Sequence, residues 1–427
     1  MSREMVYSGN PWIGDIPSSW GVERIKTIFK ERTELSEDGS ETLLSVSEYY
    51  GVANRSERVS EGEFVSRAET LVGYKKCYVG DLVSNIMLAW KGSMGITEID
   101  GIVSPAYCVY EPSPRIYPKY YHYLFRTSLY TSIFRLYSKG IIDSRLRLYS
   151  PYFFDISAII PSLPEQQKIA SFLDRKCAEI DEMIALQEKI VEELKAYKQS
   201  VITEAVTKGL NPDAPMKDSG IEWIGEIPEH WKQCKIKNGL EINPIQSHRL
   251  EENTEVSYMP MECLRNGVIE KRTALYRNLP SLTEFSEGDI VMAKVTPCFE
   301  NGNIAIASDL TNGVGFGSSE VFVFRCYDNT LPSYAFYYLQ SSYVKARGVS
   351  SMTGTGGLKR INPHYFCDTT MLLPTLLEQQ EIAEYLDTQC KEIDNLILIK
   401  ISKIDSLKEY KKSIIYEYVT GKKEVTE

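Results

Sequence analysis

A chain of 427 residues is long enough for two to four domains with buried cores. Its formal net charge of −10 and its pI near 5.3 exclude a protein that coats nucleic acid over its whole surface. Nine cysteines without a Cys-x-x-Cys pair indicate reduced thiols, and four scattered histidines do not form a metal cluster, so we expect no metal site. We find no signal peptide and no apolar run near 18 residues, so we expect a cytoplasmic protein.

Each half of the chain begins with a similar tryptophan-containing segment. Residues 11–20 read Pro-Trp-Ile-Gly-Asp-Ile-Pro-Ser-Ser-Trp, and residues 222–231 read Glu-Trp-Ile-Gly-Glu-Ile-Pro-Glu-His-Trp. Trp20 and Trp231 are therefore separated by 231 − 20 = 211 residues. A glycine turn and an Ile-Pro pair lead to each Trp, which we expect to anchor the segment on a hydrophobic face. The match indicates that the chain is an internal duplication.

A body of roughly 140 residues follows each segment, and landmarks survive in both bodies. Gly80-Asp81-Leu82-Val83 matches Gly288-Asp289-Ile290-Val291, and each opens a run of short alternating segments that predicts strands joined by hairpins. A Tyr-rich helix is predicted near 117–125 and again near 331–339. We interpret four of its tyrosines as core rather than base-stacking residues: Tyr120, Tyr123, Tyr334 and Tyr337.

Charge is segregated within the bodies. Residues 64–150 hold 11 basic and 6 acidic side chains, and residues 112–142 and 329–367 contain no acid at all. A phosphate backbone would be attracted by such stretches, although a solvated face or a protein interface would explain them too. The candidate DNA contacts in the first body are Lys75, Lys91, Arg115, Lys139, Arg145 and Arg147. Those in the second body are Lys294, Asn301, Lys345, Arg347, Lys359 and Arg360.

Two long helices without internal Pro or Gly are predicted over residues 163–208 and 376–421. Apolar residues recur every seven positions, which predicts a coiled coil; two ordinary surface helices are the alternative. In an antiparallel pair Leu173 would face Ile414, and the polar residues Gln187 and Lys400 would meet and fix the register. Cys177 and Cys390 occupy the same repeat position and are expected to be buried. Each helix would be ~60 Å long at ~1.5 Å per residue.

We recognise no catalytic or cofactor-binding motif in the sequence. The segment at 354–360 lacks the spacing of a phosphate-binding loop and is interpreted as a flexible basic loop. Asn362-Pro363-His364-Tyr365 lacks the second Pro of the adenine methyltransferase motif, and no Gly-rich cofactor loop follows a strand. We therefore expect no catalytic residues in this chain.

Several repeated motifs together resemble the specificity subunit of type I restriction-modification systems. They are Trp-Ile-Gly-x-Ile-Pro, Gly-Asp-Leu/Ile-Val and the helix that opens Glu-Gln-Gln-x-Ile-Ala at Glu165–Ala170 and Glu378–Ala383. The resemblance implies an α+β fold in which two tandem α/β target recognition domains are joined by two long helices forming an antiparallel coiled coil, with a pseudo-twofold internal repeat. The expected domains are target recognition domains at 1–162 and 221–375, spacer helices at 163–208 and 376–421, a linker at 209–220 and a tail at 422–427.

The resemblance also implies a function. Each domain would read one half of a split DNA site, and the helices would set the spacing and dock two methyltransferase subunits, which restriction subunits join. S-adenosylmethionine, ATP and Mg would belong to those partners. Because the two bodies have diverged, the target is expected to be asymmetric. Two other classes stay open: a coiled-coil adaptor that binds only proteins, and a stand-alone enzyme acting on nucleic acid.

Overall fold

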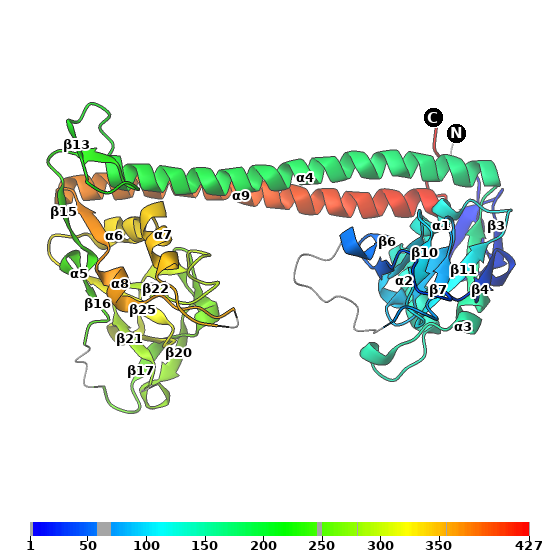
Figure 1. The fold of residues 1–427 in the computed structure, drawn as a ribbon, viewed down its shortest axis with the longest axis horizontal. Helices are drawn as coiled ribbons and strands as arrows, with labels where there is room; N and C mark the ends of the chain where they lie inside the picture. The colour runs from blue at the N-terminus through cyan, green and yellow to red at the C-terminus, as the bar shows by residue number, and fades with distance from the viewer. Residues whose placement is uncertain (1–2, 58–69, 246–249, 280, 356, 427) are drawn as a thin grey trace. The chain divides into compact units, whose positions relative to one another are not determined.

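The computed structural model describes residues 3–57, 70–245, 250–279, 281–355 and 357–426 (Figure 1). They form two compact units, the first made of 1–187 with 402–427 and the second of 188–401. The division falls inside the long helices α4 (Leu163–Lys208) and α9 (Leu376–Val419), so each unit contains a mixed α/β body and one segment of each helix. Among the described residues, no helix has the length and apolar character needed to cross a membrane.

The body of the first unit is built on a four-stranded antiparallel sheet. Its strands, in spatial order, are β4 (Phe29–Arg32), β11 (Tyr107–Pro112), β8 (Leu82–Asn85) and β9 (Met94–Ile96). Four antiparallel pairs surround it: β1 (Met5–Tyr7) with β2 (Asp15–Pro17), β3 (Gly21–Arg24) with β12 (Ser157–Ile160), β5 (Leu44–Ser47) with β6 (Gly51–Asn54), and β7 (Lys75–Cys77) with β10 (Gly101–Val103). The α-helices are α1 (Pro118–Leu124), α2 (Ser128–Tyr137) and α3 (Ser150–Asp155), and the 3-10 turns are η1 (Ile25–Thr27), η2 (Arg55–Glu57), η3 (Ala89–Lys91) and η4 (Asp143–Arg145). Every residue of β8 is buried, including the polar residues Ser84 and Asn85, so this strand lies at the centre of the body.

The second unit repeats this plan and adds a sheet. The repeated sheet has the order β16 (Leu240–Ile242), β25 (Val321–Cys326), β22 (Ile290–Ala293) and β23 (Ile304–Ile306). The added sheet has the order β20 (Arg272–Leu275), β17 (Glu255–Met259), β24 (Val314–Gly317) and β21 (Thr283–Ser286), and its β17–β24 pair is parallel. The two-stranded pairs are β13 (Met216–Asp218) with β14 (Glu226–Pro228), β15 (Lys232–Lys235) with β26 (Thr370–Leu373), and β18 (Leu264–Arg265) with β19 (Val268–Ile269). Its α-helices are α5 (Ile236–Gly239), α6 (Pro332–Leu339), α7 (Ser342–Ser350) and α8 (Pro363–Cys367), with 3-10 turns η5 (Met261–Cys263), η6 (Tyr276–Asn278) and η7 (Thr311–Gly313).

The tyrosine helices α1 and α6 lie in the cores of their units, as predicted. Tyr120, Tyr334 and Tyr337 are buried, and Tyr123 is half-buried. The expected linker at 209–220 contains a strand, because β13 pairs with β14 just as β1 pairs with β2 in the first unit. This part of the chain therefore belongs to the tryptophan segment of the second copy.

The helices α4 and α9 run antiparallel in the first unit. The Phe172 ring lies 4.5 Å from the Tyr418 ring, and further along α4 the Asp181 carboxylate pairs with Lys411 Nζ at 2.6 Å. The residue number rises along α4 while that of the partner falls along α9, which defines the antiparallel direction.

The equivalent ion pair forms in the second unit with the roles of the helices exchanged. Lys198 Nζ on α4 lies 2.7 Å from the Asp394 carboxylate on α9. The two pairs correspond under the repeat, since 394 − 181 = 213 and 411 − 198 = 213. The internal repeat predicted from the sequence is thus present in side-chain contacts.

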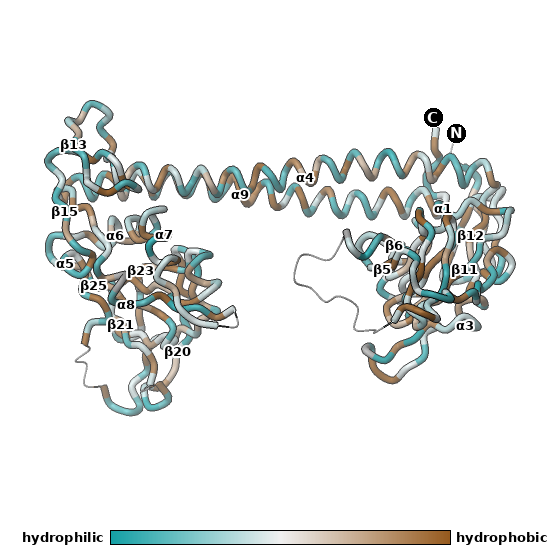
Figure 2. Tube along the Cα trace, in the orientation of Figure 1, coloured by the Kyte–Doolittle hydropathy of each residue, from teal (hydrophilic) through white to brown (hydrophobic). Residues whose placement is uncertain are grey.

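Apolar positions recur along both helices (Figure 2). The positions predicted for the seam are buried at Leu173, Cys177, Ile180, Leu386, Cys390, Ile393, Leu407 and Ile414. Gln187 and Lys400 are both half-buried, and they belong to different units. Their pairing stays a prediction.

The Glu-Gln-Gln motif fastens each long helix to its body. Trp20 Nε1 donates to Glu165 at 2.7 Å, and Trp231 Nε1 donates to Glu378 at 3.2 Å. The glutamine that follows each glutamate caps the start of the tyrosine helix, because its side-chain oxygen accepts from the backbone N–H of Tyr117 or Leu331 at 2.8 Å. The predicted anchoring role of the two tryptophans is confirmed.

Each body is also tied to the end of the other long helix. The Tyr120 hydroxyl donates to the Val419 carbonyl of α9 at 2.7 Å, and the Tyr334 hydroxyl donates to the Val206 carbonyl of α4 at 3.5 Å. The first unit is therefore closed by the C-terminal helix, which explains why residues 402–427 belong to it.

Acid is expected to weaken the second unit through Glu378. Burial raises the pKa of this carboxyl, but hydrogen bonds from Thr375, His230 and Trp231 outweigh burial and lower the pKa to about 2. Because an unfolded glutamate has a pKa of ~4.3, the stabilisation is complete above that pH and is lost as the pH falls toward 2. We expect Tm to fall less steeply between pH 5 and pH 2.5 in Glu378→Gln than in the unaltered chain. Parallel Tm curves would contradict this assignment.

Candidate nucleic-acid interface

Four predicted DNA contacts of the first unit gather around one projecting loop. This loop, the first finger (residues 139–147), is closed by two hydrogen bonds of 2.9 Å between the backbones of Lys139 and Arg147. Arg145 is exposed near its tip, in η4. Lys91 is exposed on η3 and lines a pocket together with Asp143 of the finger.

An aromatic platform that the sequence did not suggest supports this finger. The Arg135 guanidinium lies 4.9 Å from the centre of the Trp90 ring and pairs with Asp143 at 2.8 Å. Lys91 Nζ lies 5.3 Å from the same ring. The Trp90-Lys91 dipeptide, in an otherwise apolar turn, is the sequence feature from which this platform could have been predicted.

The other two predicted contacts of the first unit are engaged elsewhere. Lys75 is half-buried on β7, and its Nζ donates to the Tyr107 carbonyl at 2.7 Å. Arg115 is exposed but pairs with Glu23 at 3.0 Å.

The stretches without acids in the sequence are not free of acids in space, which corrects the charge interpretation. Lys119 lies 3.0 Å from Glu98 and 3.3 Å from Asp174. Arg126 donates to three backbone carbonyls of the β5–β6 turn and to the Met94 carbonyl of β9, at 2.8 to 3.5 Å, so it ties this hairpin to the sheet. Carboxylates far away in the chain thus neutralise cations that the local sequence leaves unpaired.

Three predicted contacts of the second unit come together at the equivalent place. The second finger, described at 353–355 and 357–360, is closed by backbone hydrogen bonds of 2.9 and 2.8 Å between Thr353 and Arg360. Arg360 donates to both carboxylate oxygens of Glu320, from Nε at 2.9 Å and from Nη2 at 2.7 Å. Lys359 is exposed, and half-buried Lys294 is bonded through its backbone to Glu320 and Ile361.

The remaining three lie around helix α7. Lys345 is half-buried and donates to Gln199 of α4 at 3.2 Å, and burial, followed by the charge of Lys198, lowers its pKa. Asn301 is exposed in a turn, and Arg347 is partly buried on α7. Lys345 thus joins the body to the helix pair.

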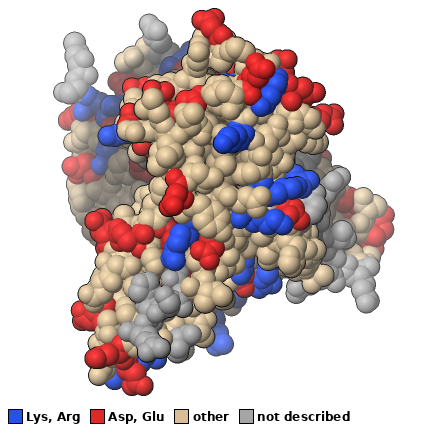
Figure 3. Space-filling model, turned by 90° about the vertical axis from the view of Figure 1, so that its left-hand side faces the viewer, with Lys and Arg blue, Asp and Glu red and all other residues tan. Residues whose placement is uncertain are grey.

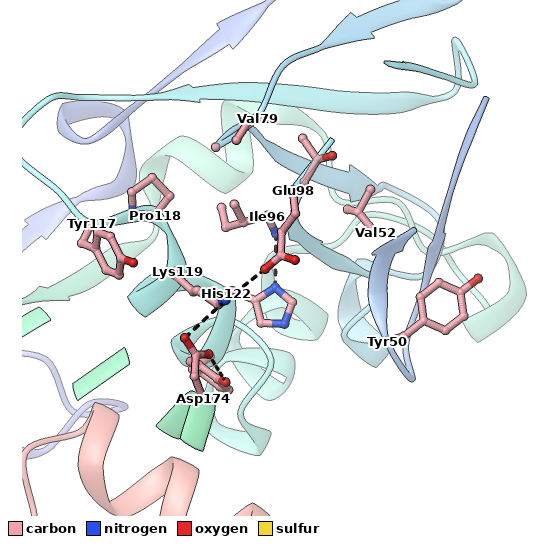
Figure 4. A pocket seen from close by; sticks show the side chains of 13 residues that line it. Tyr50, Val52, Val79, Ile96, Glu98, Tyr117, Pro118, Lys119, His122 and Asp174 are labelled. Atoms are coloured by element: carbon pink, nitrogen blue, oxygen red, sulfur yellow. Dashed lines mark hydrogen bonds and ion pairs between the residues drawn. The ribbon is translucent and has the colours of Figure 1, made fainter. Parts of the chain in front are cut away.

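A pocket of about 470 Å³ lies where the first body meets α4 (Figure 4). Lys119 and the carboxylates of Glu98 and Asp174 face one another across it, and the Tyr123 hydroxyl donates to Asp174 at 2.6 Å. Burial, helped by nearby Arg126 and Lys119, lowers the pKa of His122 to about 3, so this ring is neutral at pH 7. Since the charges of the pocket are already paired, it suits a structural junction better than a phosphate site.

Charges of both signs are interspersed on the face drawn in Figure 3. This face therefore carries no continuous basic surface, which agrees with the acidic net charge of the protein. Within the described residues, no three His, Cys, Asp or Glu side chains are grouped so that they could hold a metal ion.

Comparison with known protein families shows to which family this duplicated chain belongs. The family model described as the type I restriction modification DNA specificity domain matches twice, at residues 17–196 and 228–418. The chain belongs to the type I restriction-modification specificity family. The two matched regions correspond to the two copies found in the sequence.

Individual relatives in this family support the assignment. The EcoAI specificity subunit of Escherichia coli is 29% identical over 199 residues, which cover 45% of this chain but only 33% of that relative. Two proteins of Methanocaldococcus jannaschii match over greater lengths. The MjaVIII specificity subunit is 27% identical over 79% of both chains, and the putative MjaX specificity subunit is 26% identical over 96% of this chain and 95% of its own.

Solved structures share the fold. A chain from a study of complex assembly and conformational transition of the type I R-M system has a TM-score of 0.70 at 16% identity, covering 95% of this chain and 99% of its own. The HsdS subunit from Thermoanaerobacter tengcongensis has a TM-score of 0.53 at 17% identity, covering 95% and 98%. The predicted family and fold class are therefore confirmed: two α/β target recognition domains, long paired helices and an internal repeat.

Proposed function

We propose that the chain is the DNA-recognition subunit of a type I restriction-modification complex. Each body reads one half of a split site, and the reactive chemistry, with S-adenosylmethionine, ATP and Mg, belongs to methyltransferase and restriction subunits. The complex acts in the cytoplasm. The observation that carries this proposal is that the two bodies share one fold but carry different loops. The two fingers occupy equivalent places in that fold and differ in sequence.

Different fingers on one scaffold suit an asymmetric target. Cations on the fingers would position the duplex through phosphates, while a few side chains would read base edges. The predicted contacts Lys91, Lys139, Arg145 and Lys359 stay in this role. Lys75, Arg115, Lys345 and Arg360 are assigned to shaping the bodies, because their polar atoms already have protein partners.

The long helices are proposed to dock the methyltransferase subunits. Apolar side chains stand exposed on the α9 segment of the second unit, at Leu396, Leu398 and Ile399. A group of exposed apolar residues on a helix is typical of a protein interface.

Modification mapping tests the proposal. The chain is co-expressed with its methyltransferase subunit in a host without adenine methylation, and modified adenines are mapped by single-molecule sequencing. We expect one bipartite motif with unlike halves and a spacer between them, and we expect the motif to vanish when this chain is left out. Methyl transfer by the purified chain alone would instead indicate a stand-alone enzyme. A complex that forms without any salt-dependent binding of duplex DNA would indicate a protein adaptor.

A further inference from the structure

The tip of the first finger presents bare apolar side chains to solvent. Ile141 is 100% exposed and Ile142 is 54% exposed. Single exposed apolar residues are common on protein surfaces and need no explanation by themselves. Two exposed isoleucines in succession at the end of one loop are a stronger signal, because their combined apolar surface stays in contact with water unless a partner covers it.

Hydrogen bonds fix the shape of this finger. Its stem is held by the two backbone bonds between Lys139 and Arg147, and its tip by the Arg145 N–H, which donates to the Ile142 carbonyl at 2.8 Å. Gly140 has φ +153, and a Cβ there would lie 2.5 Å from the Arg145 carbonyl oxygen. Only glycine permits the chain to turn so closely, so the tip is shaped before any partner binds.

The surroundings of the tip are cationic. Lys139 and Arg145 are exposed on the finger, and Lys139 Nζ lies 4.7 Å from the centre of the Tyr152 ring. The one carboxylate of the finger, Asp143, is paired with Arg135. An apolar tip between cations complements a polyanion that displays apolar groups between its charged edges. The major groove of DNA has that character, because thymine C5-methyl groups lie between two phosphate backbones.

The second finger repeats the design with a different tip. Gly354, at φ +139, would place a Cβ 2.4 Å from the Leu358 carbonyl oxygen, as Gly140 does with Arg145. Leu358 is 47% exposed and is followed by exposed Lys359 and Arg360. Two bodies that bind different half-sites require the same fold with different residues at the finger tips, and the two fingers have this arrangement.

We propose that the first finger enters the major groove of its half-site and that Ile141 reads a thymine by contact with its C5-methyl group. Lys139 and Arg145 then lie against the flanking phosphates. This inference rests on the proposed function and deepens it, since it names a residue that determines specificity and the chemical group that it reads.

A double-mutant cycle tests the inference. The full chain, assembled with its methyltransferase subunits, is titrated with duplexes of the mapped motif in which each thymine is replaced in turn by uracil, which removes only the methyl group. We expect one uracil to weaken binding about 3- to 10-fold, as the loss of one or two buried methyl-sized contacts does. Ile141→Ala should weaken binding to the thymine duplex by a similar factor and should lose nothing further on the uracil duplex.

Leu358→Ala is the matched control, because it should leave that uracil effect intact. Because Ile141 is fully exposed, Ile141→Ala should fold as the unaltered chain does, and equal Tm values of the two chains check this point. If the uracil substitution and Ile141→Ala each weakened DNA binding and their effects added, the inference would be overturned. A half-site without thymine would overturn it too. So would an Ile141→Ala variant that assembles less well with methyltransferase while its affinity for DNA is unchanged. These outcomes leave site-specific binding by the unaltered chain intact, whereas absence of that binding would overturn the proposed function itself.

Discussion

Replacing Asp289 by alanine is expected to lower the free energy of unfolding of the second unit by about 2–3 kcal/mol, less than for a fully buried pair because the Arg325 side chain is 36% exposed. The Asp289 side chain is 2% exposed and accepts two hydrogen bonds from Arg325, at 2.8 and 2.7 Å. It also accepts from the Ser286 backbone N–H at 2.7 Å. Removing the carboxylate takes away the two charge-assisted hydrogen bonds of the Arg325 guanidinium to Asp289 and the acceptor of the Ser286 amide. Urea denaturation followed by circular dichroism would measure the loss.

A double variant separates the uncompensated charge from simple loss of packing. Asp289→Leu combined with Arg325→Met removes both charges and should recover at least half of the stability, because a buried ion pair can be replaced by apolar groups at little cost. Glu179→Ala, which breaks an exposed pair with Lys176, should leave the unfolding curve almost unchanged, because water screens such a pair. A loss below about 1 kcal/mol in Asp289→Ala would contradict the structural role assigned to the pair.

The equivalent aspartate of the first unit reaches its arginine by another route. Asp81 accepts from Arg32 at 2.8 and 3.2 Å and from the Tyr78 N–H at 2.9 Å. Burial raises the pKa of Asp81, although Arg32 and the Tyr78 amide oppose the rise, and the Asp81 hydrogen bond raises the pKa of Arg32. Arg32 comes from β4, whereas Arg325 comes from β25, which corresponds to β11. The Gly-Asp-Leu/Ile-Val motif therefore fixes the carboxylate, and each body supplies the cation from a different strand.

This difference illustrates what could be predicted from the sequence. The helices, the docked tryptophans and the tyrosine cores follow from periodicity and from a constant offset between copies, which are properties of the linear chain. Partners far apart in sequence have no such signal. Arg115 pairs with Glu23, 92 residues away, and Arg360 with Glu320, 40 residues away. Charge counted along the chain consequently overestimated how many cations are available to phosphates.

The fingers were only partly predicted, for a related reason. The basic residues and glycines of both loops are visible in the sequence, and they suggested a flexible basic loop at 354–360. The structure instead bonds this segment to its neighbours, since the Thr296 hydroxyl donates to the Gly357 carbonyl at 2.8 Å and accepts from the Lys359 N–H at 2.9 Å. The exposure of Ile141 depends on the direction of the loop, which no local pattern specifies.

Shortening both long helices by one heptad is expected to change the DNA spacer that the complex recognises. Deleting residues 184–190 and 397–403 removes equivalent heptads, since 397 − 184 = 213, and leaves Val191 and Ile404 in the repeat positions of Ile184 and Ile397. Seven residues of α-helix correspond to about 10 Å at ~1.5 Å per residue. Since base pairs are stacked at ~3.4 Å, the preferred spacer should become shorter by about three base pairs.

Binding to the original site should fall by more than about 100-fold, because only one half-site could then be engaged and the effective concentration of the second body would be lost. A panel of duplexes with unaltered half-sites and spacers of different length would measure both effects. Glu188→Ala, an exposed change inside the same heptad at constant helix length, is the control and should leave the preferred spacer as it was. If the shortened chain folds, assembles with methyltransferase and still prefers the original spacer, the long helices do not measure the distance between half-sites. Their proposed role would then be limited to closing the two units and docking the catalytic subunits.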